Sequence, residues 1–275
     1  MTGRTILVTG CSSGIGLCVA RGLHARGWRV FASARKPGDV ARLTGEGLEC
    51  LQLDLDNSDS IAAAVEEVLA RTGGTLDALF NNGAYGQPGA VEDLTRSVLR
   101  MQFETNLFGW HELTRLVLPV MRRQGHGRII QHSSVLGFVA LRYRGAYNAS
   151  KYALEGLTDT LRLELRGSNI HVSLIDTGPV TSRFRENAHA AFLRNIDRDN
   201  SVHREYYARV VKRLTTKGPV VPFTLPPDSV LKKVVQALES RNPRPRYCVT
   251  FPTYLFAFLK RILPQRALDR ILYRI

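Results

Sequence analysis

Short apolar runs rich in valine, isoleucine and leucine recur along the chain, and segments with helical periodicity separate them. Such runs are typical of strands that are buried on both faces of a sheet. Helical crossovers between parallel strands are right-handed, so this order predicts an α/β fold. We expect a doubly wound parallel sheet (Rossmann fold) of about seven strands with helices on both faces. The runs span residues 6–8, 30–32, 48–53, 76–80, 128–131, 170–175 and 247–249.

The helical segments carry start and stop signals. In the clearest case Asn57 is a candidate N-cap, an apolar stripe follows over residues 58–71, and Gly73 and Gly74 end the pattern. A longer helical pattern extends over residues 95–121 and contains Asn106, a residue that costs roughly 0.7 kcal/mol relative to alanine inside a helix.

No repeat or Pro/Gly-rich linker divides the 275 residues, and a chain with 44% apolar residues can bury one full core. We therefore expect a single Rossmann-type domain over residues 1–275. Residues 183–225 are more polar and less periodic, which predicts a mobile insertion that covers the substrate. Residues 251–275 form a basic amphipathic segment whose apolar part is too short to span a bilayer.

Charge and cysteine usage narrow the function classes. Lysine and arginine number 38 against 24 acidic residues, a net charge of +14 that attracts phosphate-bearing cofactors, anionic lipid or nucleic acid. The four cysteines have no metal-type spacing, and residues 111–115 begin like a zinc motif but end in arginine, so we expect no catalytic metal. The first apolar run begins at residue 6 and leaves no room for a leader, which predicts a cytoplasmic protein.

Gly10, Gly14 and Gly16 follow the first predicted strand and open a helix. Glycines in this place let backbone amides approach a pyrophosphate at the positive end of the helix. The second strand ends at Arg35, with no acid to meet the ribose hydroxyls of NAD. Because a guanidinium binds phosphate oxygens in pairs, we expect NADP(H) as the cofactor.

Tyr147 and Lys151 are four residues apart, which places them on one face of a helix. A nearby ammonium favours the phenolate, so we expect Lys151 to lower the pKa of Tyr147. Ser134 directly follows the fifth strand, at the edge of the sheet where ligands bind. The pattern predicts a site that exchanges a proton near neutral pH.

Together these motifs resemble the short-chain dehydrogenase/reductase family over nearly the whole chain. The spacings of 28, 13 and 4 residues between Asn106, Ser134, Tyr147 and Lys151 are most similar to its hydroxysteroid and retinol dehydrogenase branch and to bacterial NADP-dependent aldehyde reductases. The resemblance implies that these four residues are catalytic, with Asn106 distorting its helix and fixing a water that links Lys151 to solvent. The implied cofactor contacts are Gly10, Ser12, Ser13, Gly14, Ile15, Gly16, Arg35, Asp54, Leu55, Asn82, Gly83, Tyr147, Lys151, Gly178, Val180 and Ser182.

The resemblance also implies what each group does. Asp54 and Leu55 would flank the adenine, Asn82 the adenosine ribose, and Val180 the nicotinamide carboxamide. Ser182 keeps a hydroxyl where the family has threonine. Two departures stand out: the family's alanine and glycine are exchanged at Gly83 and Ala84, and Thr177 replaces a proline, which we expect to loosen the following loop. His132 and Ser133 are expected to be packing residues.

The family chemistry implies a reaction at a carbonyl. Tyr147 would supply a proton, Ser134 would polarise the oxygen, and Lys151 would also bind ribose hydroxyls. We expect an NADPH-dependent oxidoreductase that reduces a hydrophobic aldehyde or ketone, including steroid- or retinoid-like ones, to an alcohol. Apolar and aromatic residues are candidates for the pocket lining, with ordinary core packing as the alternative for each of them: Phe138, Val139, Leu141, Tyr143, Phe184, Phe192, Tyr206 and Tyr207.

Other readings stay open. The alternative function is a non-catalytic NADP(H) sensor or a scaffold protein, although Tyr147 and Lys151 are both retained. The resemblance implies a homo-oligomer, dimer or tetramer. The C-terminal segment could contact an anionic membrane surface, the protein core or another subunit. No motif for specific nucleic-acid binding is present.

Overall fold

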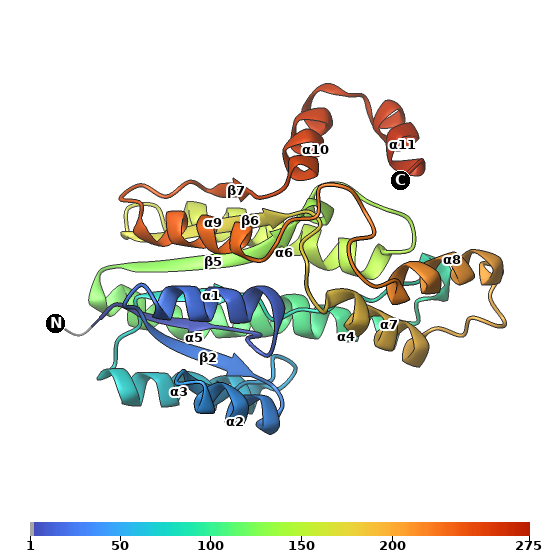
Figure 1. Cartoon of the computed structure of the whole chain (residues 1–275). Coiled ribbons are helices and arrows are strands. Elements are labelled where there is room, and N and C mark those ends of the chain that lie inside the picture. Colours follow the sequence, from blue (N-terminus) through green and yellow to red (C-terminus); the bar gives the residue numbers. More distant parts are fainter. Residues whose placement is uncertain (1–2) are drawn as a thin grey trace.

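Seven parallel strands form one sheet in the computed structural model, which describes residues 3–275 (Figure 1). The strand order is β3-β2-β1-β4-β5-β6-β7. The chain adds strands on one side of β1 up to β3 and then on the other side from β4 onwards, which is typical of doubly wound folds. The predicted fold class is confirmed, and each predicted apolar run overlaps a strand. The strands are β1 Thr5–Val8, β2 Arg29–Ala34, β3 Glu49–Gln52, β4 Ala78–Asn81, β5 Gly127–Ser134, β6 Ile170–Thr177 and β7 Arg246–Cys248.

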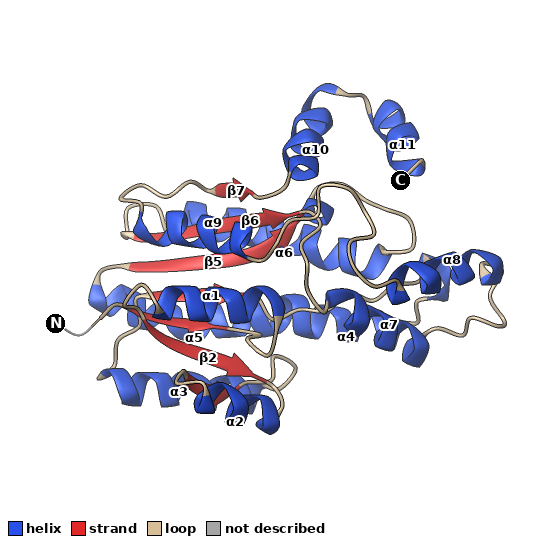
Figure 2. Cartoon of the chain, in the orientation of Figure 1, coloured by secondary structure: helices blue, strands red, loops and turns tan. Residues whose placement is uncertain are grey.

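Helices cover both faces of the sheet, as Figure 2 shows by colour. Successive residues of a strand point to opposite faces, so Ile6 and Val8 join a core under α1, α2 and α9, whereas Leu7 joins a core under α3, α5 and α6. Both cores are apolar and almost fully buried. These helices are α1 Gly14–His24, α2 Pro37–Gly45, α3 Ser58–Thr72, α5 Gly109–Gln124, α6 Gly145–Glu164 and α9 Asp228–Glu239.

The helix signals are confirmed where they were clearest. The side chain of Asn57 accepts a hydrogen bond of 2.9 Å from the backbone N–H of Ser60 at the start of α3. Gly73 ends the helix in the left-handed conformation, with φ of 66°. In contrast, the long pattern over residues 95–121 is divided into α4 (Arg96–Phe103), a π-helical turn (Glu104–Phe108) and α5.

Residues 183–225 contain two helices, α7 (Phe184–Asn195) and α8 (Arg204–Thr215). Phe192 and Tyr207 form a small buried core with Ala90 and Ile196, so these two aromatic residues hold the insertion to the protein. The Tyr207 hydroxyl accepts a 2.9 Å hydrogen bond from the Ala90 N–H. For these two residues the structure therefore shows core packing, the alternative to a place in the pocket lining.

Helices α10 (Phe251–Ile262) and α11 (Gln265–Tyr273) follow β7 and stand at the top of the molecule in Figure 1. Leu268 and Leu272 of α11 pack with Val139, Phe138 and Leu141. These last three side chains thus anchor the C-terminal helices, which is the packing role that the sequence left open for them. No helix within residues 3–275 is long and apolar enough to cross a bilayer.

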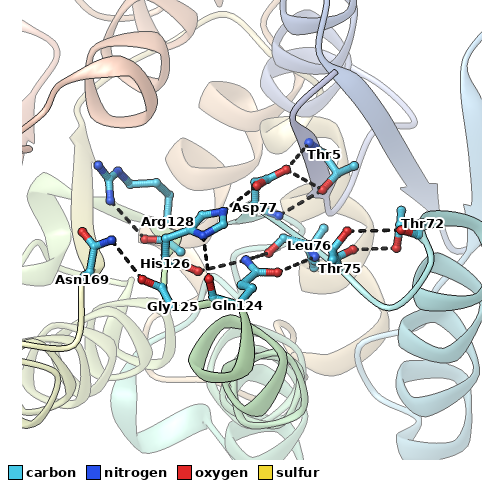
Figure 3. Close-up of polar contacts among 11 residues, drawn as sticks. Thr5, Thr72, Thr75, Leu76, Asp77, Gln124, Gly125, His126, Arg128 and Asn169 are labelled. Atoms are coloured by element: carbon cyan, nitrogen blue, oxygen red, sulfur yellow. Dashed lines mark hydrogen bonds and ion pairs between the residues drawn. The ribbon is translucent and has the colours of Figure 1, made fainter. Parts of the chain in front are cut away.

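Polar contacts fasten the amino-terminal edge of the sheet, opposite the strand ends that carry the predicted site (Figure 3). The Asp77 carboxylate accepts hydrogen bonds from the Thr5 N–H at 2.7 Å and the Thr5 hydroxyl at 2.9 Å, and it contacts His126 Nε2 at 2.8 Å. Burial acts to raise the pKa of Asp77, but the bonds from Thr5 and His126 outweigh it and lower this pKa. This cluster joins β1, β4 and β5 and is structural.

Candidate active site

Gly10 and Gly16 make room for a close crossing of backbone segments at the carboxyl end of β1. A Cβ on Gly10 would come within 2.6 Å of the Gly83 Cα, and Gly10 has a positive φ of 71°. A Cβ on Gly16 would lie 2.6 Å from the Asn82 side-chain nitrogen. Both positions therefore require glycine, for steric reasons that the motif alone did not show.

Helix α1 begins at Gly14 with Ser13 as its N-cap residue, and no side chain caps its first turn. Its first N–H groups therefore remain available at the positive end of the helix, which fits the binding of a pyrophosphate. Ser182, from the loop after β6, lies over this turn, because a Cβ on Gly14 would be 3.0 Å from the Ser182 Cβ. The structure thus brings together two predicted cofactor contacts that are far apart in the sequence, Gly14 of the glycine motif and Ser182.

Arg35 is exposed directly after β2, and no side-chain hydrogen bond from it is formed within residues 3–275. Burial raises the pKa of Asp56, in the segment that follows β3, and the positive charge of Arg35 opposes part of this rise. Asp54 accepts a hydrogen bond from the Asp56 N–H at 3.2 Å in the same segment. A guanidinium here is free to take a phosphate. Arg42 was not predicted, yet it donates a 2.7 Å hydrogen bond to the Ser12 carbonyl oxygen.

Thr9 joins the segment after β4 to the glycine loop. The Thr9 hydroxyl accepts hydrogen bonds from the N–H groups of Asn82 at 2.8 Å and Gly83 at 2.9 Å. A Cβ on Gly83 would lie 3.1 Å from the Leu55 side chain, so glycine at this position lets Leu55 sit close. The exchange of alanine and glycine relative to the family therefore has a local packing reason.

His132 and Thr177 connect this segment to the ends of β5 and β6. His132 Nδ1 lies 2.9 Å from the Asn82 side-chain oxygen, and Nε2 lies 3.2 Å from the Thr177 hydroxyl. Burial, and next the charge of Lys151, lower the pKa of His132 to about 3, so the ring is neutral. His132 is therefore a hydrogen-bonded structural residue, in line with its predicted structural role. The Thr177 hydroxyl also donates a hydrogen bond of 3.4 Å to the Ser133 carbonyl oxygen of β5, and the expected loosening of the following loop stays a prediction.

Tyr147 lies near the start of α6, and Ser134 ends β5. Burial raises the pKa of Tyr147 to about 12, and a hydrogen-bonding contribution from Ser134 offsets part of this rise. The predicted lowering by Lys151 is wrong for this structure, because the Lys151 Nζ lies 5.8 Å from the Tyr147 ring centroid and is directed elsewhere. Tyr147 consequently holds its proton at neutral pH.

Lys151 is almost completely buried, one turn after Tyr147 on α6. Its Nζ donates a 2.7 Å hydrogen bond to the His132 carbonyl oxygen and lies 4.1 Å from the Trp110 ring centroid. Burial lowers the pKa of Lys151 to about 7, while the carboxylates of Glu155 and Asp176 act in the opposite direction. The ammonium therefore titrates in the physiological range.

Asn106 lies fully buried within the π-helical turn, where the predicted helix distortion is confirmed. Its side-chain nitrogen donates to the Tyr85 carbonyl oxygen at 2.9 Å, and its side-chain oxygen accepts from the Tyr85 N–H at 3.2 Å. A weaker contact of 3.3 Å reaches the Ser150 hydroxyl, next to Lys151. Asn106 thus joins the segment after β4 to α6. A water held by it remains a prediction.

The loop after β6 covers the site. A Cβ on Gly178 would collide with the Thr250 hydroxyl, so this position also requires glycine. Val180 forms a parallel β-bridge with Leu225, so the two ends of the insertion lie side by side. Phe184 stands edge-on against Tyr147, with ring centroids 5.3 Å apart. The start of the insertion therefore lies over the predicted proton donor.

A buried charge cluster behind Lys151 was missed by the sequence interpretation. Arg246 of β7 forms ion pairs with Glu155 of α6 and Asp176 of β6, and Glu155 also accepts a hydrogen bond from Ser133. The Asp176 side chain is fully buried and that of Glu155 nearly so. An acidic residue one turn after Lys151 was the only available signal in the sequence.

Comparisons with known proteins agree with this geometry. The family model described as short chain dehydrogenase matches residues 4–191. The chain is 42% identical over 269 residues to the uncharacterized oxidoreductase YbbO of Escherichia coli strain K12, covering 98% of this chain and 94% of the relative. It is 33% identical over 268 residues to human 17-beta-hydroxysteroid dehydrogenase type 1, covering 91% and 78%. A short chain dehydrogenase/reductase from Burkholderia phymatum, solved in complex with NAD, has the same fold, with a TM-score of 0.80 at 23% identity over 98% and 95% of the two chains.

Proposed function

Because the chain belongs to the short-chain dehydrogenase family and is thus an oxidoreductase, we propose that it reduces a hydrophobic aldehyde or ketone to an alcohol with NADPH. The observation that carries the proposal is the hydrogen bond between Tyr147 of α6 and Ser134, at the carboxyl end of β5, with Lys151 one turn further along the same helix. Bound NADPH would supply the hydride. The test is a panel of apolar aldehydes and ketones, followed by NADPH absorbance with NADH in parallel. Binding of NADPH without its oxidation by any compound would contradict the proposal.

Two findings support an apolar substrate. Phe184 forms an aromatic wall over Tyr147, the proposed proton donor. A human relative at 33% identity is named for its action on hydroxysteroids, which are apolar alcohols. Steroid- and retinoid-like ketones and aldehydes therefore belong in the panel beside small aliphatic ones.

The chain's own groups would act on the substrate oxygen as follows. The Tyr147 hydroxyl gives its proton to the oxygen as negative charge develops there, and the Ser134 hydroxyl hydrogen-bonds the same oxygen. The Lys151 ammonium would bind the nicotinamide ribose hydroxyls, a role that depends on its charge. Asn106 and His132 hold the surrounding segments in place.

Replacing Arg35 by glutamine should raise the Kd for NADPH by about tenfold to a hundredfold, because one charge-assisted set of hydrogen bonds to the 2′-phosphate is lost, worth about 1.5–3 kcal/mol. The Kd for NADH should change little. Isothermal titration with both cofactors measures the two effects. Arg26→Gln is the matched control, since Arg26 is equally exposed but lies in the turn before β2. An equal loss for both cofactors would show that Arg35 does not contact the 2′-phosphate.

The rate of carbonyl reduction should fall as pH rises through about 7. Lys151, with its pKa lowered to about 7, is charged below this pH and neutral above it, whereas Tyr147, with a pKa of about 12, keeps its proton throughout. We therefore expect kcat/KM to decline by up to about tenfold per pH unit on the alkaline side. Steady-state kinetics between about pH 5 and about pH 9 measure this profile. In Lys151→Arg, whose guanidinium stays charged, the decline should disappear; a wild-type profile that is flat to the alkaline end would overturn the assignment.

A further inference from the structure

Helix α10 has an apolar face that nothing covers within residues 3–275. Its inner side packs Phe256, Leu259 and Leu263 towards α11 and Val139. The opposite side exposes apolar and aromatic residues at helical spacing, and Phe258 is 60% exposed. A helix that is apolar on two sides needs a second partner besides its own core. The exposed residues are Phe251, Tyr254, Leu255, Phe258 and Ile262.

Phe223 extends this surface towards the insertion. Its ring centroid lies 4.9 Å from that of Phe251, and its side chain is 56% exposed. We name these six side chains together, Phe223 with the five on α10, the α10 face. Contiguous exposed apolar surfaces of this kind on a protein mark sites of interaction with another protein or a membrane.

Exposed basic residues lie on α10 and in the segment that follows it. Arg261 follows Phe258 by one helical turn, α11 carries the exposed Arg266 and Arg270, and Arg274 comes directly after α11. None of these four side chains forms an ion pair or a hydrogen bond within residues 3–275. The one acidic residue over positions 251–275 is Asp269. The four unpaired guanidinium groups of the C-terminal segment favour an anionic partner, and the α10 face favours one that is apolar beneath its charges.

We propose that the α10 face docks on the surface of an anionic phospholipid bilayer. Phenylalanine, tyrosine, leucine and isoleucine enter the boundary between head groups and acyl chains, while the arginines meet the lipid phosphates. A second copy of the chain fits less well, because a two-fold interface would bring the same arginines of both copies towards each other. Nucleic acid would pair with the arginines but leave the apolar side chains in water.

The docked orientation has a consequence for the reaction. Helix α10 begins directly after β7, at the carboxyl edge of the parallel sheet where Ser134 and Val180 also lie. Phe223 is two residues before Leu225, which pairs with Val180. Docking would therefore turn the reactive edge towards the lipid, from which an apolar carbonyl compound could enter. This consequence rests on the proposed function, whereas docking itself does not.

The test is co-sedimentation of the purified full chain with large vesicles, without cofactor or substrate. Vesicles of phosphatidylcholine and phosphatidylglycerol in equal parts should retain the protein, and vesicles of phosphatidylcholine alone should retain much less. Because no turnover is measured, a failure here leaves the proposed function standing, and an inactive enzyme that binds vesicles leaves docking standing. Absence of the protein from both pellets would overturn docking.

Variants separate the apolar and basic contributions. Phe258→Asp should weaken binding to the mixed vesicles at least about tenfold. Its control, Val202→Asp, makes the same charge change at a side chain that is 84% exposed between α7 and α8, and it should bind like the wild type. The double variant Arg261→Gln, Arg270→Gln should lose about fivefold per arginine, against little loss for Arg26→Gln, Arg166→Gln. Circular dichroism of each variant confirms the fold.

Two results would count against the bilayer as partner. Unchanged vesicle binding in Phe258→Asp would show that the α10 face is not the contact. A dimer by light scattering that Phe258→Asp converts to a monomer, together with no vesicle binding by the wild type, would assign the face to a second copy of the chain.

Discussion

Replacing Tyr147 by phenylalanine is expected to lower kcat for carbonyl reduction by about 10²–10⁴-fold, because the variant has no proton to give to the substrate oxygen. The Kd for NADPH should stay within about twofold, since most of the cofactor is held elsewhere, by the glycine loop and Arg35. The ring would remain packed against Phe184, so the fold should not change. Stopped-flow turnover and fluorescence titration of NADPH measure the two quantities on one sample.

Tyr152→Phe is the matched control for this substitution. Tyr152 lies on the same helix as Tyr147, is 40% exposed, and its hydroxyl forms no hydrogen bond within residues 3–275. Its loss should leave kcat unchanged. Equal rates for Tyr147→Phe and the wild type would show that the proton comes from another group. A wild type that binds NADPH tightly and reduces nothing would favour the sensor alternative.

The sheet could be predicted because its signals are local. Each strand is an apolar run, and Asn57 and Gly73 mark helix ends through hydrogen bonds or dihedral angles of adjacent residues. The spacing of Tyr147 and Lys151 placed both on α6 for the same reason. In physical terms, these features depend on backbone geometry within one or two turns, which the order of residues determines.

Features that depend on contacts between distant segments could not be predicted. Glu155 and Arg246 are 91 positions apart in the chain, and His132 and Asn82 are 50 apart. Phe192 and Tyr207 were candidates for the pocket lining in the sequence, but in the structure their rings contact each other in a separate small core. The pKa of Tyr147 was misjudged for a related reason: spacing gives the distance between two groups along a helix, whereas burial depends on the whole fold.

The side chain that depends most on such distant contacts is Arg246, and its replacement by methionine should lower the free energy of unfolding by about 3 kcal/mol. Methionine removes the cation that pairs with Glu155 and Asp176 and leaves two carboxylates buried together. Loss of one partner from a buried ion pair costs about 3–5 kcal/mol, and we expect the lower end because part of the Arg246 side chain is exposed and screened by water. Urea unfolding followed by circular dichroism measures the loss.

The loss should also depend on pH. Burial, and next the charge of Glu155, raise the pKa of Asp176 above its usual range, while Arg246 opposes this rise. Without Arg246 the pKa should rise further, so the folded variant binds protons that the unfolded chain releases. Its stability relative to the wild type must therefore fall as pH rises from the unfolded value of about 3.9 through the folded pKa. Acidic buffer should restore part of the loss.

Arg128→Met separates this electrostatic effect from the loss of a long side chain. Arg128 lies on β5 and donates hydrogen bonds to the carbonyl oxygens of Gly127 at 3.2 Å and Ser240 at 3.3 Å, with no carboxylate partner. Its replacement should cost less and show no added dependence on pH. If the two variants lose equal stability at every pH, the carboxylates behind Lys151 do not need the Arg246 charge. The cluster would then contribute packing alone, and the balance of charges around Lys151 would have to come from elsewhere in the site.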